Sequence, residues 1–288
     1  MEKITPTTIN WLPQKTFELT FSIPWNEVKK DYSKALEEIS KDTTIEGFRK
    51  GKAPLSMVEK KVDKAKIYGL VLDKLLPQTY FSAIKKHNLR PIVDPKIEPI
   101  STEEAKDWEF KATSCEAPDV VLGDYQAKLK SLTAKDKIWV PGKDKDKKPE
   151  KSQEDRLPEI FKLLLETSKV ELAQILINQE TDRMLSRLLE ELKRLGISLD
   201  QYLQTNSKTT ESLRKEYQEN AEQTLQLEFI LQDIGQKEKI SVTDTEIDQM
   251  IKAVPDEKQR KNLDTPMQKA YIASILRKRK VVDFLTKI

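Results

Sequence analysis

"IEGFRKGKAP", residues 45–54, is the stretch on which the interpretation of this chain depends. The whole chain contains only seven glycines, and two of them, Gly47 and Gly51, stand four residues apart here. Because glycine adopts positive φ at no steric cost, the pair allows a sharp turn that holds the intervening residues at a loop tip. That tip would display one aromatic ring and three cations: Phe48, Arg49, Lys50 and Lys52.

Two interpretations of this loop are open on the residues alone. In the first, the loop binds a partner, since arginine pairs with phosphate or carboxylate through two hydrogen bonds and an aromatic ring stacks or fills a pocket. Eight cations face four anions between Lys41 and Lys66, which supports this interpretation. In the second, the loop is an ordinary tight turn in which Phe48 packs back into the core and the cations are merely hydrated.

The strands around the loop predict an α+β domain over residues 1–118. "KTFELTFSI" (15–23) and "DWEFKATSC" (107–115) alternate apolar and polar residues, the period of a half-buried strand. The proline-rich "PIVDPKIEPI" (91–100) is typical of an edge strand followed by a turn. Strands at both ends of the segment indicate an antiparallel sheet.

The helices expected between these strands follow from apolar residues at spacings of three and four. One helix ends near Lys41, just before the loop, and Pro54 opens a second one after it. A third is expected over residues 66–88, where Pro77 should kink or split it. The predicted order is therefore β-β-α-loop-α-α-β-β.

The second half of the chain, residues 157–288, predicts an elongated all-α domain. Leucines repeat at helical spacing before Gly196, a natural C-cap, and capping-box patterns begin at Ser198 and Thr243. Between the two domains, residues 119–156 are expected to form an extended segment and then a charged linker, because their second part is rich in lysine and aspartate and poor in apolar residues.

Composition excludes several classes of protein. Charged residues make up 34% of the chain, above the usual ~25%, and the net charge is only +3, so a helix-rich, solvated protein fits better than a disordered one. One cysteine and one histidine exclude a disulfide framework and an ordinary Cys/His zinc site, and no cofactor is expected. No apolar run is long enough to span a membrane and no secretory signal is visible, so a cytoplasmic location is expected.

Catalytic chemistry is not expected. His87 stands at the end of a predicted helix, where a capping or surface role is favoured, and Cys115 alternates with apolar neighbours as a small buried residue would. No glycine-rich phosphate-binding pattern occurs. The run Arg277–Lys280 spreads around a helix, which favours a solvated helix end over a nucleic-acid site, and no DNA partner is expected.

Several segments together resemble the trigger factor family of bacterial chaperones. "GFRKGKAP" is similar to the loop of that family's ribosome-binding domain, and "VLDKLLPQTYFSAIKKHNLRPIVDPKIE" and "WEFKATSCEAPDVVLGDY" resemble the same domain in order and spacing. In the second half, "INQETDRMLSRLLEELKRLGISLDQYLQ" and "LRKEYQENAEQTLQLEFILQDIGQKEKISVTDTEI" resemble the family's helical C-terminal domain.

The resemblance implies an ATP-independent chaperone that docks beside the ribosomal exit tunnel and holds nascent chains. Its implied partners are ribosomal protein and rRNA at the tunnel exit, nascent or unfolded polypeptides, and a second copy in a weak homodimer, with no membrane or DNA partner. The implied ribosome-binding residues are Gly47, Phe48, Arg49, Lys50, Gly51, Lys52 and Pro54. Candidate client-binding residues are Met184, Leu188, Leu192, Tyr271 and Ile275, each of which is explained equally well by helix packing.

One departure from the family pattern is plain. Trigger factors usually carry a peptidyl-prolyl isomerase domain between these two halves, but residues 131–156 number only 26, fewer than the ~50 of a small independent domain. We therefore expect a shortened form without isomerase activity. The alternatives are a ribosome-independent holdase resembling periplasmic folding factors and, less in keeping with this gap, a true prolyl isomerase.

Overall fold

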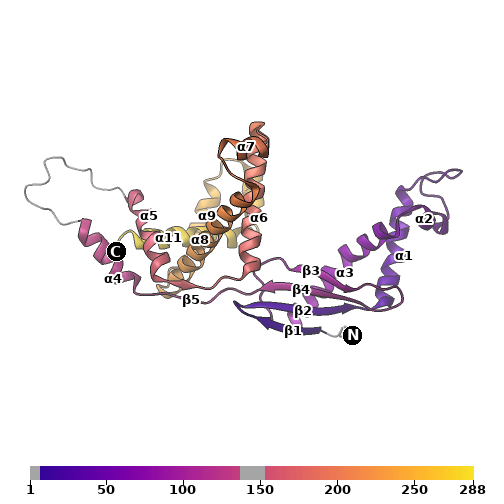
Figure 1. Ribbon diagram of the computed structural model, residues 1–288, viewed down its shortest axis with the longest axis horizontal. Coiled ribbons are helices and arrows are strands. Elements are labelled where there is room, and N and C mark those ends of the chain that lie inside the picture. The colour runs from indigo at the N-terminus through magenta and orange to yellow at the C-terminus, as the bar shows by residue number, and fades with distance from the viewer. Residues whose placement is uncertain (1–6, 137–152) are drawn as a thin grey trace, which may run out of the picture. The chain divides into compact units, whose positions relative to one another are not determined.

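The computed structural model describes residues 7–136 and 153–288. The chain divides into two compact units, Met1–Ala117 and Pro118–Ile288. The first combines an antiparallel sheet with helices, and the described part of the second is almost entirely helical (Figure 1). The α+β class expected for the first domain and the helical class expected for the second are confirmed.

A four-stranded antiparallel sheet forms the base of the first unit, in the order β1 (Thr7–Leu12), β2 (Thr16–Ile23), β4 (Trp108–Cys115) and β3 (Lys96–Ser101). Alternation along β2 turns Phe17, Leu19 and Phe21 to the core, and none of them is exposed to solvent. Phe21 lies opposite Phe110 of β4, with ring centroids 5.9 Å apart. The proline-rich strand β3 lies at the edge of the sheet, as its sequence predicts.

Three helices complete this unit: α1 (Trp25–Asp42), α2 (Leu55–Lys61) and α3 (Lys64–Lys86). Val28 of α1, Val58 of α2 and Val71 of α3 belong to one core cluster with the apolar face of the sheet. The predicted order of elements is confirmed. Pro77, however, does not split α3, which continues through it.

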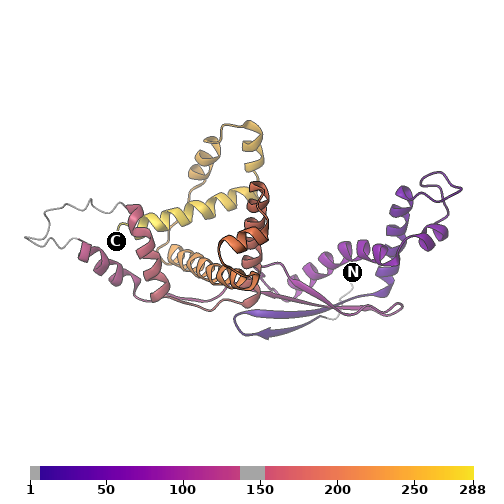
Figure 2. The ribbon, with the colours of Figure 1, turned by 45° about the horizontal axis from the view of Figure 1, so that its top comes forward.

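The second unit contains eight described helices and a small two-stranded sheet. The helices are α4 (Tyr125–Asp136), α5 (Gln153–Thr167), α6 (Gln174–Leu195), α7 (Leu199–Thr205), α8 (Thr210–Lys237), α9 (Asp244–Lys252), α10 (Glu257–Leu263) and α11 (Pro266–Leu285). Strands β5 (Val120–Val121) and β6 (Lys169–Val170) pair antiparallel. The long helix α8 packs against α5, α6 and α11, while α9 and α10 lie against α11 (Figure 2).

The helix ends confirm the capping predictions. Gly196 ends α6 with φ of 71°, in the left-handed region that glycine adopts without strain. Ser198 and Thr243 each open a helix through a capping box. Glu246 of the Thr243 capping box also accepts a hydrogen bond from Lys280 of α11. The hydrogen bonds from Lys280 and from Thr243 lower the pKa of the Glu246 carboxyl to about 2.

The prediction of an extended segment after residue 118 is mostly wrong. Only Val120–Val121 form a strand, and residues 125–136 form helix α4. Tyr125 and Leu129, four residues apart on one face, are both buried, and the Tyr125 hydroxyl donates to Glu238 Oε1 at 2.8 Å. Burial of these two side chains therefore stabilises a helix that the short local sequence pattern does not predict. The middle of the expected linker, residues 137–152, lies outside the described residues.

Cys115 provides a test of the first unit's core. Its side chain is fully buried, and burial raises the pKa of the thiol to about 11. Because only the thiolate reacts, and about one thousandth of the thiol is ionised at pH 8, we expect the native protein to react negligibly with a disulfide reagent, whereas the denatured protein reacts at once. A colorimetric thiol assay with and without denaturant measures this, and rapid labelling of the native protein would contradict the packing of β4.

Candidate functional site

The glycine-flanked loop joins α1 to α2, at the end of α1 that points away from the sheet (Figure 1). Gly47 has φ of 86° and Gly51 has φ of 76°, so both glycines adopt the conformation for which the sequence selects them. Two turns follow one another: Phe48 N donates to Ile45 O at 3.0 Å, and Lys52 N donates to Arg49 O at 2.9 Å. The loop is therefore a defined double turn.

The base of the loop is fixed to the body of the unit. Ile45 and Ala53 pack against the core cluster on either side of the tip. Lys61 of α2 donates from Nζ to Thr44 O at 2.8 Å, which ties the entry of the loop to the helix that follows it. Pro54 then precedes the first turn of α2. Because both ends are held, the residues between them project from the unit.

Phe48 decides between the two interpretations of this loop. Its side chain is 39% exposed and does not belong to the core cluster, so the ordinary turn with a buried ring is wrong. Lys50 Nζ pairs with Asp42 at 2.9 Å, which lowers the pKa of that carboxyl. Arg49 and Lys52 are exposed, and neither forms a recorded ion pair within residues 7–136 and 153–288. The tip thus offers a ring, a guanidinium and an ammonium to a partner.

The candidate client-binding residues differ in how far their side chains are buried. On α6, Met184 and Leu188 are half-buried, and Leu192 is only 5% exposed. Leu192 therefore serves the packing of the helices, and its expected contact with a client is wrong for this conformation. On α11, Tyr271 is 63% exposed and Ile275 is 44% exposed.

Met267, one turn before Tyr271 and 79% exposed, extends the exposed face of α11. We refer to Met267, Tyr271 and Ile275 as the α11 stripe. Residues four apart on a helix lie on the same side, so the three side chains form a continuous apolar surface. An exposed apolar surface of this kind is typical of a binding site.

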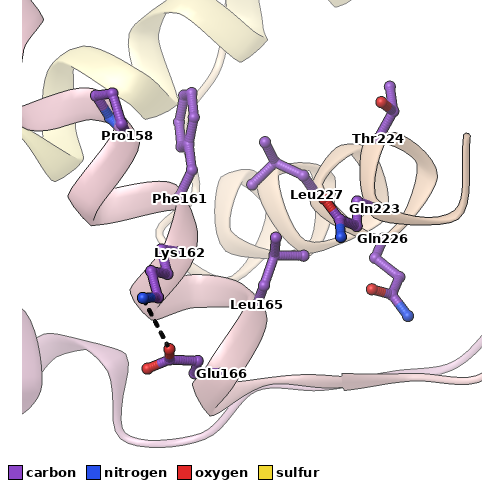
Figure 3. A pocket seen from close by; sticks show the side chains of 9 residues that line it. All are labelled: Pro158, Phe161, Lys162, Leu165, Glu166, Gln223, Thr224, Gln226 and Leu227. Carbon is purple, nitrogen blue, oxygen red and sulfur yellow. Dashed lines mark ion pairs between the residues drawn. The ribbon is translucent and has the colours of Figure 1, made fainter. Parts of the chain in front are cut away.

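A second apolar surface lies between α5 and α8. It is a groove of ≈ 570 Å³, lined by Pro158, Phe161, Lys162, Leu165, Glu166, Gln223, Thr224, Gln226 and Leu227. Figure 3 shows Phe161 and Leu165 projecting from α5 and Leu227 from α8, with the Lys162–Glu166 ion pair on α5 beside them. We refer to it as the α5–α8 groove. The sequence did not reveal it, because apolar residues four apart are equally typical of a helix core.

His87, considered for catalysis, and part of the run considered for nucleic-acid binding have structural roles. His87 is the C-cap of α3, and its Nε2 lies 2.8 Å from Thr7 Oγ1. In the run Arg277–Lys280, Lys278 pairs with Glu228 and Lys280 pairs with Glu246, so two of its four cations hold α11 in place. Among the described residues, no three potential metal ligands cluster, and no helix combines the length and apolarity needed to cross a membrane.

Comparison with known protein families gives a consistent result for both halves. A family model described as bacterial trigger factor protein matches residues 6–150. A second, described as the C-terminus of bacterial trigger factor protein, matches residues 143–287. The two matched ranges meet in the middle of the chain and leave no unmatched interval between them.

Curated relatives cover part of the chain. The trigger factor of Lactobacillus gasseri is 37% identical over 109 residues, which are 38% of this chain and 24% of the relative. The trigger factor of Lacticaseibacillus casei is 34% identical over 145 residues, which are 50% of this chain and 32% of the relative. The chain therefore spans about a quarter to a third of the length of these relatives.

One solved structure supports the fold over nearly the whole chain. It is described as showing promiscuous substrate recognition in folding and assembly activities of the trigger factor chaperone. It covers 98% of this chain and 99% of its own, with a TM-score of 0.58 and 13% sequence identity. At this identity the similarity shows the fold alone.

The two glycines of the loop should differ in their tolerance of a side chain. Both have positive φ, so Gly47→Ala and Gly51→Ala each carry a backbone strain of about 1–2 kcal/mol. At Gly51, an added Cβ would also lie 3.0 Å from the Lys41 carbonyl oxygen, whereas at Gly47 it would meet open space. We expect Gly51→Ala to speed amide exchange of residues 43–54 more than Gly47→Ala. Equal exchange in the two variants would contradict this loop geometry.

Proposed function

This chain belongs to the bacterial trigger factor family, and we propose that it is an ATP-independent chaperone that docks on the ribosome and holds nascent or unfolded polypeptides. The observation that carries the proposal is the loop tip: Phe48 and Arg49 are exposed on a double turn whose base is fixed to the core. We further propose that residues 1–118 form the docking domain and residues 157–288 the client-binding domain.

Docking would use the residues of the loop in different ways. Gly47, Gly51 and Pro54 shape it, while Arg49 and Lys52 supply positive charge to rRNA phosphates or acidic side chains at the tunnel exit. Phe48 supplies an apolar ring for a pocket or a stacked base. Lys50 pairs with Asp42, but because both side chains are exposed the pair is weak, and Lys50 would also be available to an anionic partner.

Client binding would use several weak apolar contacts at once. The α11 stripe and the α5–α8 groove both present apolar side chains beside charged or amide groups, a combination that accepts many sequences. Met184 and Leu188 on α6 are half-buried and would contribute only their exposed edges. Contacts that are weak individually and linked along one chain add to a useful affinity while allowing release.

We also propose that the chain lacks prolyl isomerase activity and works in the cytoplasm, forming at most a weak homodimer. The adjoining family matches leave no interval in which an isomerase domain could lie. A proline-limited refolding assay tests this proposal, because catalysis at substoichiometric protein would overturn it. The ribosome-independent alternative gains no support from the described residues, since it gives the exposed loop tip no role.

The docking proposal predicts the behaviour of a triple variant. Replacing Phe48, Arg49 and Lys50 by alanine removes the ring and two cations while keeping both glycines. We expect co-sedimentation with ribosomes to fall at least tenfold, because the electrostatic and apolar contacts are lost together.

The matched control replaces Phe81, Lys85 and Lys86 of α3, which are exposed on the same unit and also comprise one phenylalanine and two cations. This variant should sediment like the unmodified protein. The docking role of the loop is wrong if the two variants bind ribosomes equally well.

The client surfaces predict a second pair of variants. We expect Phe161→Ser with Leu165→Ser, and separately Tyr271→Ser with Ile275→Ser, to weaken suppression of aggregation of a denatured protein by about two- to fivefold, and the combined variant to weaken it further. Light scattering measures the effect, and circular dichroism checks the helices. A Leu192→Ser variant should instead lower stability, because that side chain is buried.

A further inference from the structure

The first unit holds a second surface feature that the docking loop does not use. A cleft of ≈ 360 Å³ opens between α1, α2 and α3, with Trp25, Tyr32 and Tyr68 among the residues that line it. Trp25 and Tyr32 are seven residues apart on α1, two helical turns, so they lie on the same face of that helix. We call this feature the aromatic cleft.

The walls of the aromatic cleft are held in place by ring contacts. The centroids of Tyr32 and Tyr68 lie 5.0 Å apart, and those of Tyr68 and Trp108 lie 5.1 Å apart in an edge-on arrangement. The centroids of Trp25 and Trp108 lie 6.1 Å apart in a tilted arrangement. Since Trp108 is 2% exposed, it forms a rigid support behind the rings that face solvent.

The tyrosine hydroxyls of the aromatic cleft each hold a carboxylate. Tyr32 donates to Glu59 Oε1 at 3.1 Å, and Tyr68 donates to Glu104 Oε1 at 3.1 Å. Burial, followed by the hydrogen bond to Glu104, raises the pKa of Tyr68 to about 12, so its hydroxyl stays protonated and donates. Both carboxylates are therefore oriented before any ligand arrives.

The two carboxylates differ in their cationic partners. Lys64 Nζ lies 3.2 Å from Glu104, which neutralises that group. Glu59 has the Tyr32 hydroxyl as a partner but no recorded ion pair within the described residues. Lys29 also lines the cleft and is not recorded as paired with Glu59. The cleft is thus lined by two carboxylates and two lysines, and of the carboxylates only Glu59 is without an ion pair among the described residues, with Lys29 the one lining cation that could compete for it.

We propose that the aromatic cleft binds the guanidinium group of an arginine side chain in a polypeptide. A planar guanidinium stacks on aromatic rings and donates paired hydrogen bonds to a carboxylate, and the cleft is lined by both kinds of group, the rings of Trp25 and Tyr32 and the carboxylate of Glu59. A lysine ammonium would use the charge but not the stacking. An apolar side chain would remove water from Glu59 without replacing its hydrogen bonds, and a phosphate would be repelled by it.

The occupant differs in charge from the partner proposed for the loop. Arg49 and Lys52 at the loop tip favour an anionic surface, whereas Glu59 in the cleft favours a cation. Both features are built on α1 and α2, so this one unit would recognise groups of opposite charge at separate places. The inference goes beyond ribosome docking and does not require it.

The binding test uses two ligands of nearly the same shape. Acetyl-arginine-amide carries the guanidinium in a peptide-like form, and acetyl-citrulline-amide replaces it with a neutral urea. Nuclear magnetic resonance titration of the full chain should show saturable shifts of residues 25–36, 59 and 64–68 with the arginine ligand. Citrulline should bind at least tenfold more weakly.

Three variants locate the contact. Glu59→Gln keeps an acceptor for the Tyr32 hydroxyl but removes the charge, and it should weaken arginine binding at least tenfold. Glu38→Gln, an exposed position of α1 outside the cleft, should leave binding unchanged. Lys29→Gln removes a competing cation and should strengthen binding about two- to threefold.

Four results would overturn the proposal. Equal binding of the citrulline and arginine ligands would show that the cleft does not select for positive charge. Unchanged arginine binding by the Glu59→Gln variant would show that the ligand binds elsewhere. Tighter binding of free arginine than of its peptide-like form would assign the cleft to the amino acid, and preferential binding of a short RNA would assign it to another class of partner. Ribosome co-sedimentation of Glu59→Gln should be normal, so the two functions fail separately.

Discussion

The rest of the first unit depends on how the chain turns between α1 and α2, over residues 43–54. Val28 of α1 and Val58 of α2 both reach the core cluster, and Ile45 and Ala53 fix the two ends of the loop to the same cluster. Positive φ at Gly47 and Gly51 makes the reversal tight, and the approach of Gly51 to the Lys41 carbonyl closes it. Between the two glycines the chain forms the tip, where the Phe48 side chain is 39% exposed.

The second unit is governed by a shortage of apolar material. Apolar residues make up 37% of the whole chain, or roughly 39% with its seven glycines, below the ~45–50% of ordinary globular domains, so less apolar surface is available to cover each helix. Helix α8 takes the central position, with Ala221 and Ile234 fully buried against its neighbours. Even α11, which packs against α8, keeps one apolar side uncovered, as Tyr271 shows. The low apolar content therefore leaves some apolar side chains of this helical unit exposed.

Periodicity and capping residues predicted the elements of the first unit and the helix ends at Gly196, Ser198 and Thr243 in the second, because both signals are local. They could not predict what covers a helix face. Leu192 and Tyr271 stand at similar helical spacings, yet one is buried and the other open, since burial depends on helices distant in sequence. Helix α4 was missed for the same reason: its partner Glu238 lies more than a hundred residues away. The aromatic cleft likewise joins four separate segments.

The position of Glu59 links the loop to the aromatic cleft. It lies on α2, the short helix that begins where the loop ends, and its partner Tyr32 lies on α1, which leads into the loop. The hydrogen bond between these residues therefore ties together the same two helices that the loop connects. A cation bound at Glu59 would add a second contact across them and restrict the motion of the loop base, because a ligand that bridges two elements favours the conformation in which both reach it. Phe48 and Arg49 at the tip do not line the cleft, so cleft binding and ribosome docking would use separate surfaces of the same unit.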